Sequence, residues 1–133
     1  MRVASYLLFP ATLITLAVQV WNAKADEVKV VQKIPGYVCM DQNAVEATAL
    51  DMSGFPPVYG GPSRDAPKTG VAAGVLIVAD PLHIENGRRQ VLRIDGSIAW
   101  IDTKVLKPWV GKTASAQCSP VLLSNNRRGI LIR

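Results

Sequence analysis

Residues 75–101 read VLIVADPLHIENGRRQVLRIDGSIAWI, and this stretch decides the fold class. Three of its segments have the length of strands, namely the apolar segment 75–79 and the segments 89–94 and 97–101. Asn86-Gly87 is a dipeptide typical of hairpin turns, because both residues tolerate a positive φ, and Asp95-Gly96 predicts a second hairpin turn. The stretch therefore predicts consecutive antiparallel strands and an all-β protein.

The remaining sequence has the same character. Further short apolar segments with strand-like composition lie at 28–34, 36–40, 120–123 and 129–132. Residues 41–50 fit either a helix capped by Asp41 or a strand that follows a turn, and we favour the strand. Residues 53–70 contain four prolines, which predicts a long, turn-rich loop. Residues 102–106 fit a single helical turn ended by Pro108. Short strands without a long amphipathic helix indicate a small barrel or sandwich.

The first 25 residues have the pattern of an export signal. A positive charge at Arg2 precedes an uncharged stretch at residues 6–18, and Ala23-Lys24-Ala25 supplies small residues for cleavage before Asp26. The alternative is an uncleaved membrane anchor, although the uncharged stretch is shorter than the ~20 residues that span a bilayer. Removal of 25 of the 133 residues leaves a mature chain of 108. We expect this chain to have no membrane span and to be periplasmic or secreted.

The composition excludes several classes of enzyme. The chain has 1 His and 2 Cys, too few for a multi-histidine site or a four-thiolate zinc site. His83 lies near a predicted hairpin turn, and no nucleophile motif accompanies it. We therefore expect a protein that is not an enzyme, with no catalytic residue, metal or cofactor.

The two cysteines predict a disulfide. Cys39 and Cys118 both lie in the mature chain, and an even number of cysteines in an exported protein favours pairing. The alternative is a catalytic or metal-binding thiol, for which His83 is the only histidine available as a base.

Residues 44–109 resemble a bacterial Src-homology-3-like (SH3-like) domain. The resemblance rests on the order and spacing of VYGGPS at 58–63, the glycine-containing strand at 70–78, LRIDG at 92–96 and AWI at 99–101. It implies one SH3-like domain over 26–133, with a barrel at 44–109. The flanks 26–43 and 110–133 lie outside the pattern, and the disulfide would join them as additional strands beside the barrel.

Two departures from the SH3-like pattern affect the expected activity. Relatives that bind proline motifs carry an aromatic residue at each of two positions of the pattern. In this sequence Arg89 and Gln90 lie near the first of these positions, and Val105 occupies the second. The resemblance therefore does not favour recognition of proline motifs.

Four aromatic residues are candidates for a ligand groove. By the resemblance, these side chains would cluster near the predicted loop and the end of the barrel: Phe55, Tyr59, Trp100 and Trp109. An exposed aromatic strip could stack on a peptide or on a sugar ring. The alternative is that each aromatic only completes the small core.

Charge is concentrated in the second half of the chain. Residues 88–133 contain nine basic and two acidic side chains, whereas residues 26–87 contain four basic and eight acidic ones. The candidate basic patch comprises Arg88, Arg89, Arg93, Lys104 and Lys107, and Lys112, Arg127 and Arg128 extend the basic region. Such a patch would suit an anionic partner, while a solvated surface is the alternative. We expect no binding to nucleic acid, because no recognition motif is present.

The resemblance and the predicted export together imply a function. We expect a non-enzymatic binding module of the cell envelope that recognises cell-wall peptide or glycan, or an envelope protein. The alternative is a small periplasmic inhibitor or an accessory subunit of another envelope protein.

Overall fold

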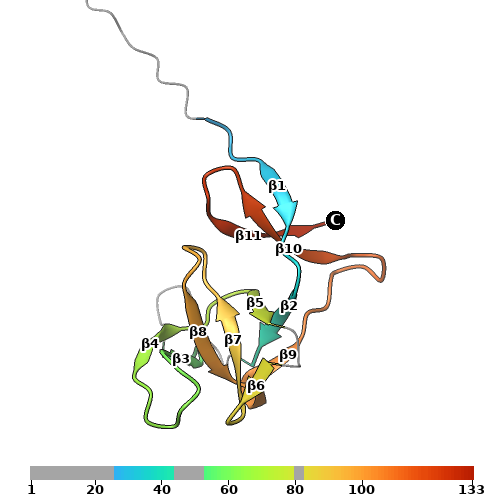
Figure 1. Cartoon of the computed structure of the whole chain (residues 1–133). Coiled ribbons are helices and arrows are strands. Elements are labelled where there is room, and N and C mark those ends of the chain that lie inside the picture. The colour runs from blue at the N-terminus through green and yellow to red at the C-terminus, as the bar shows by residue number, and fades with distance from the viewer. Residues whose placement is uncertain (1–25, 44–52, 80–82) are drawn as a thin grey trace, which may run out of the picture.

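The protein is all-β in the computed structural model, which describes residues 26–43, 53–79 and 83–133 (Figure 1). The predicted export signal and most of the ambiguous segment 41–50 lie outside the described residues. The strands are β1 Val30–Lys33, β2 Tyr37–Gln42, β3 Pro57–Tyr59, β4 Lys68–Val71, β5 Leu76–Ala79, β6 Ile84–Glu85, β7 Arg88–Leu92, β8 Ile98–Asp102, β9 Leu106–Pro108, β10 Cys118–Leu123 and β11 Arg128–Ile132. One 3-10 turn, η2 (Thr103–Val105), connects β8 to β9 and confirms the predicted helical turn.

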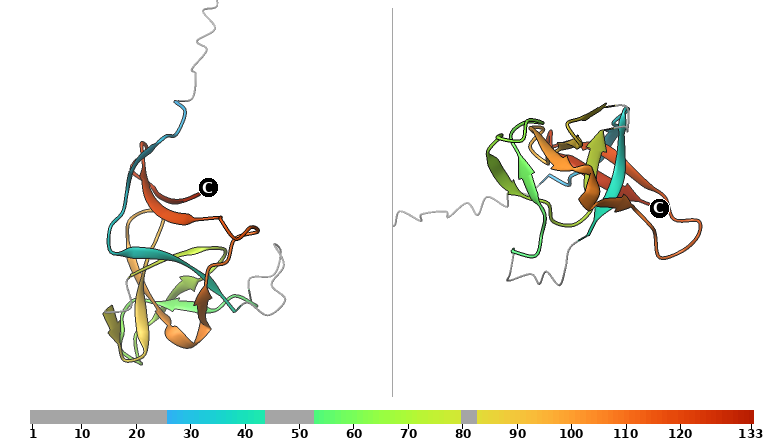
Figure 2. Two further views of the ribbon diagram at one scale, coloured as in Figure 1. Left: turned by 90° about the vertical axis from the view of Figure 1, so that its right-hand side faces the viewer. Right: turned by 90° about the horizontal axis from the view of Figure 1, so that it is seen from below.

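The strands form two antiparallel sheets. The larger sheet has the order β4-β3-β8-β7-β5-β2-β9, with β6 paired to β7, and the smaller sheet has the order β1-β10-β11. Figures 1 and 2 show the smaller sheet against one side of the larger one. Within the described residues, the terminal strands β4 and β9 are not paired with each other. The all-β prediction is confirmed, but a closed barrel is not found.

The hairpin turns form where the sequence predicts them. Asn86 and Gly87 have φ values of 49° and 74°, and they connect β6 to β7 with Glu85 opposite Arg88. Two successive residues with positive φ define the tight turn that matches the twist of a β-hairpin. Gly96 has a φ of 88° in the turn between β7 and β8.

Strand β5 is buried on both of its faces, which explains its uninterrupted apolar sequence. Leu76 and Val78 belong to the core cluster inside the larger sheet. Ile77 is opposite Cys39 of β2 and therefore shares the other face with it. Because Cys39 is bonded to Cys118 of β10, this second face lies against the smaller sheet.

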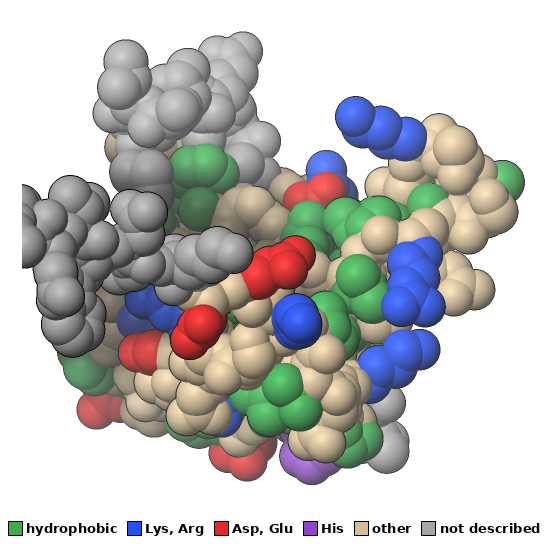
Figure 3. All heavy atoms as spheres, turned by 90° about the horizontal axis from the view of Figure 1, so that it is seen from above, with side chains coloured by type: hydrophobic (Ala, Val, Ile, Leu, Met, Phe, Trp, Pro, Cys, Tyr) green, Lys and Arg blue, Asp and Glu red, His purple; other side chains and the backbone are tan. Residues whose placement is uncertain are grey.

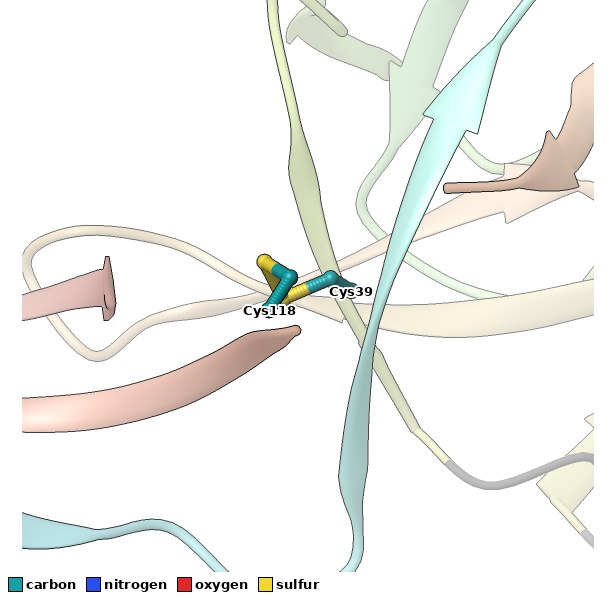
Figure 4. Close-up of a disulfide and its surroundings, with 2 residues drawn as sticks. All are labelled: Cys39 and Cys118. Atoms are coloured by element: carbon teal, nitrogen blue, oxygen red, sulfur yellow. A yellow bond between two sulfur atoms is a disulfide. The ribbon is translucent and has the colours of Figure 1, made fainter. Parts of the chain in front are cut away.

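The disulfide is the covalent link between the two sheets (Figure 4). The Cα atoms of Cys39 and Cys118 are 6.0 Å apart, and both cysteines are accounted for, so the predicted pairing is confirmed. No helix of the described residues is both long enough and apolar enough to cross a bilayer.

Two parts of the predicted organisation differ from the structure. The segment 53–70, predicted as a loop, contains β3 and the first residues of β4, because Val58 enters the core and is paired with Gly70. Strand β2 lies in the predicted flank 26–43 but is an inner strand of the larger sheet, between β5 and β9. Strand β1, from the segment 26–43, pairs with β10, from the segment 110–133.

Candidate binding groove

The four candidate aromatic residues do not form one strip. Tyr59 of β3 is paired with Trp100 of β8, so these two lie together, and Trp100 is 8% exposed. Trp109 is half-buried and lines a separate cleft next to the disulfide. The residues that line this cleft do not include Phe55, which is half-buried, or the Tyr59–Trp100 pair.

Arg88 is a buried structural residue and does not contribute to an exposed patch. Its Nε donates to the Asp102 carboxylate at 3.0 Å, and its Nη1 donates to the carbonyl oxygens of Gly61 (3.1 Å) and Ser63 (2.7 Å). Its guanidinium also lies 3.6 Å from the centroid of the Tyr59 ring. Arg88 therefore fastens the loop after β3 to the ends of β7 and β8.

Arg89 is also buried, with 6% of its surface exposed. It lies on the core face of β7, where its Nε donates to the carbonyl oxygen of Ala79 at 3.2 Å and its Nη1 reaches the sulfur of Met40. The candidate basic patch is therefore corrected: Arg88 and Arg89 belong to the interior, because both faces of β7 are covered. Lys104 and Lys107 are exposed, and Arg93 is half-buried.

A groove of about 660 Å³ lies between the two sheets, and we call it the intersheet groove. It is lined by Val58 and by residues 70–73, 75–77, 91–95 and 127–130. Most of the lining side chains are apolar, while the charged ones are Arg93, Asp95, Arg127 and Arg128. The sequence indicated this site only through the excess of basic residues after position 87, because the two sheets that bound it meet through long-range pairing.

Two glycines make room for the arginines of the groove. The Nη2 of Arg93 donates to the carbonyl oxygen (3.2 Å) and to the hydroxyl (3.1 Å) of Thr69, and a Cβ at Gly70 would lie 3.0 Å from it. The Nη1 of Arg128 would lie 2.6 Å from a Cβ at Gly96. Because Gly70 and Gly96 have no side chain, the guanidinium groups of Arg93 and Arg128 can lie close to the backbone.

The groove has an excess of positive charge. Among the described residues, the only ion pair is Arg88–Asp102, so no carboxylate lies within salt-bridge distance of Arg93, Arg127 or Arg128. Asp95 is the single acidic residue of the lining. Its Oδ1 accepts hydrogen bonds from the hydroxyl (2.6 Å) and the backbone N–H (2.9 Å) of Ser97, which lower the pKa of Asp95, and Arg93 adds a smaller effect in the same direction.

On the face drawn in Figure 3, most Lys and Arg side chains lie toward the right and are separated by hydrophobic and other atoms, while the acidic side chains lie mainly at the centre and left. The groove differs from the rest of the surface because its arginines have no carboxylate partners and lie on an apolar surface. Their guanidinium groups are therefore available to an anionic ligand.

The described residues offer no other obvious chemistry. No group of three or more His, Cys, Asp or Glu side chains in this part of the chain is placed to hold a metal ion. His83 is exposed just before β6. No protein-family model, curated protein or solved structure matches the sequence.

Proposed function

We propose that this protein is a non-enzymatic, exported binding module of the cell envelope whose intersheet groove captures an acidic ligand. The observation that carries the proposal is the set of three arginines without carboxylate partners, Arg93, Arg127 and Arg128, around an apolar groove. Guanidinium groups bind carboxylates through charge-assisted and often bidentate hydrogen bonds. The apolar lining would add contact area for the rest of the ligand.

Export is supported by the sequence pattern of the first 25 residues and by the disulfide. Disulfides persist in oxidising compartments such as the periplasm and the cell exterior. The resemblance to bacterial SH3-like domains supports a binding role, and we propose the SH3-like fold for the larger sheet on that basis alone.

The ligands that fit this proposal carry several carboxylates next to apolar groups. Cell-wall peptide carries free carboxylates, and so does an acidic segment of an envelope protein. Either one would supply charge complementary to Arg127, which is exposed and whose side chain has no hydrogen-bond partner among the described residues.

A second function, as an accessory subunit or inhibitor of another envelope protein, is favoured by exposed apolar residues near the start of the described chain. Val28, Val30 and Val31 are 50%, 46% and 59% exposed, and β1 is an edge strand of the smaller sheet. Exposed apolar side chains on a free strand edge are typical of surfaces that a partner covers.

The proposal is tested by charge reversal in the groove. Arg127→Glu should reduce binding of the protein to purified peptidoglycan or to acidic proteins in an envelope extract, measured by co-sedimentation and by affinity capture. Lys112→Glu makes the same change of charge at an exposed residue outside the groove lining, and it should leave binding unchanged. Equal binding by the two variants would contradict the proposal.

A further inference from the structure

We infer that the free edge of β11 accepts an extended acidic peptide as an additional strand. This inference rests on the proposed function and names its partner: a polypeptide segment with carboxylates along one side, bound in the intersheet groove. The edge, its unpaired backbone groups and the charge next to it all support the inference.

The hydrogen-bonding pattern shows which backbone groups of β11 face outward. Gln117 and Arg133 exchange two backbone hydrogen bonds of 2.9 and 3.0 Å, and the N–H of Leu123 donates to the carbonyl oxygen of Arg127 at 2.8 Å. Antiparallel strands alternate between hydrogen-bonded and non-hydrogen-bonded pairs. Every second residue from Arg127 to Arg133 therefore faces β10, and the intervening residues 128, 130 and 132 direct their N–H and C=O groups away from it.

One of these outward groups is already paired, and its partner shows how the edge is used. The N–H of Arg128 donates to the carbonyl oxygen of Ile94 at 2.8 Å, so the turn between β7 and β8 is bonded to the outer side of β11 at this point. Beyond this bond, no strand of the described chain pairs with the outer side of β11. Ile130, the next outward residue, lines the intersheet groove, so its N–H and C=O are at the boundary of the groove.

The arginines beside this edge favour the addition of an acidic strand. Arg127 and Arg128 precede and begin β11, Arg93 lies across the groove, and Arg133 follows the strand. A second copy of the chain would bring its own arginines to the same edge, and like charges on neighbouring strands are destabilising. An extended peptide that alternates acidic and apolar residues would place its carboxylates on one face and its apolar side chains on the other. Strand addition would then derive affinity from main-chain bonds and specificity from charge.

The test uses an acetylated, amidated heptapeptide of alternating Glu and Val as the probe, with the oxidised protein. We expect binding to slow the hydrogen exchange of the Ile130 amide, measured by nuclear magnetic resonance. Ile130→Pro removes the outward N–H without removing a bond to β10, whereas Ile130→Ala shortens the side chain and keeps the N–H. We expect the dissociation constant of the proline variant to exceed that of the alanine variant by about three- to tenfold, the effect of one net hydrogen bond.

A second probe leaves the protein unchanged. Two versions of the same peptide carry N-methyl groups, one on the Glu nitrogens and the other on the Val nitrogens, and both keep their charges. Alternate N–H groups of an added strand face β11, so we expect the version that lacks these groups to lose its binding. Tight binding of both methylated versions would overturn strand addition. Equal affinity of the Ile130→Pro and Ile130→Ala variants for the unmethylated peptide would also overturn it.

The failure of strand addition and the failure of the proposed function can be distinguished. If Arg127→Glu weakens binding of both the plain and the methylated peptides, strand addition is wrong and the acidic-ligand proposal stands. If the protein binds peptidoglycan in an arginine-dependent manner but does not bind the peptide, strand addition is also wrong and the acidic-ligand proposal stands. If neither the peptide nor peptidoglycan binds in an arginine-dependent manner, both proposals are wrong.

Discussion

Replacement of Arg88 by methionine tests how the structure uses its buried arginine. Methionine retains an unbranched, apolar stem in a site where the arginine side chain is 8% exposed, so the packing is largely preserved. The guanidinium is lost, and with it the hydrogen bonds to two carbonyl oxygens, the ion pair with Asp102 and the contact with the Tyr59 ring.

We expect this substitution to lower the free energy of unfolding by about 2–4 kcal/mol. Hydrogen bonds from a charged donor contribute about 1.5–3 kcal/mol each, but the contributions are not additive. The Asp102 side chain is 45% exposed and can regain water, so the ion pair itself adds at most about 1 kcal/mol. The contact with the Tyr59 ring adds about 0.5–2 kcal/mol.

Denaturant unfolding of the oxidised protein, followed by tryptophan fluorescence, measures the effect because Trp100 is paired with Tyr59 beside the substituted residue. Arg64→Met is the matched control, since Arg64 is exposed in the loop that Arg88 fastens, and it should change stability by less than about 0.5 kcal/mol. If the two variants lose equal stability, or if Arg88→Met loses less than about 0.5 kcal/mol, Arg88 does not fasten this loop.

Three further predictions concern the link between the sheets, a turn and a carboxylate. Replacement of Cys39 and Cys118 by alanine opens a loop of 79 residues and should lower stability by roughly 4 kcal/mol on the chain-entropy model, measured by denaturant unfolding. Gly96→Ala and Gly36→Ala should lower the melting temperature by similar amounts, because both glycines have positive φ and the guanidinium of Arg128, 2.6 Å from a Cβ at Gly96, is the end of a flexible side chain that can move; a much larger loss for Gly96→Ala would contradict this. The pKa of Asp95 should lie below the usual aspartate value in a carbon-detected titration, because a serine hydroxyl and a backbone N–H bond to the charged form. The contribution of Asp95 to stability is then present above the unfolded-state pKa and is lost as the pH falls through the lower folded-state pKa, and a normal pKa would contradict it.

Local signals in the sequence predicted the elements that depend on local physics. Asn86-Gly87 predicted a hairpin because both residues adopt a positive φ, and the apolar segment 75–79 predicted a buried strand. The disulfide followed from cysteine number and predicted compartment, which require no knowledge of the fold.

The features that depend on long-range pairing could not be predicted in the same way. The sequence predicted Arg88 and Arg89 as surface residues because arginine is seldom buried without partners. Their partners are carbonyl oxygens, a carboxylate and the Met40 sulfur, which lie up to 49 residues away in the sequence. The intersheet groove lies between residues 127–130 and residues of the larger sheet that are far from them in the sequence, such as 70–73. The alternation of side chains along one strand does not specify such a pairing.

The central claim, that the intersheet groove binds an acidic ligand, is tested most directly by calorimetric titration with two peptides that differ only in charge. One is the heptapeptide of alternating Glu and Val, and the other carries Gln in place of each Glu. We expect the acidic peptide to bind more tightly, with an affinity that falls as salt is raised and that is reduced by Arg127→Glu. Equal affinity for the two peptides, or an affinity for the acidic peptide that is independent of salt, would contradict the claim.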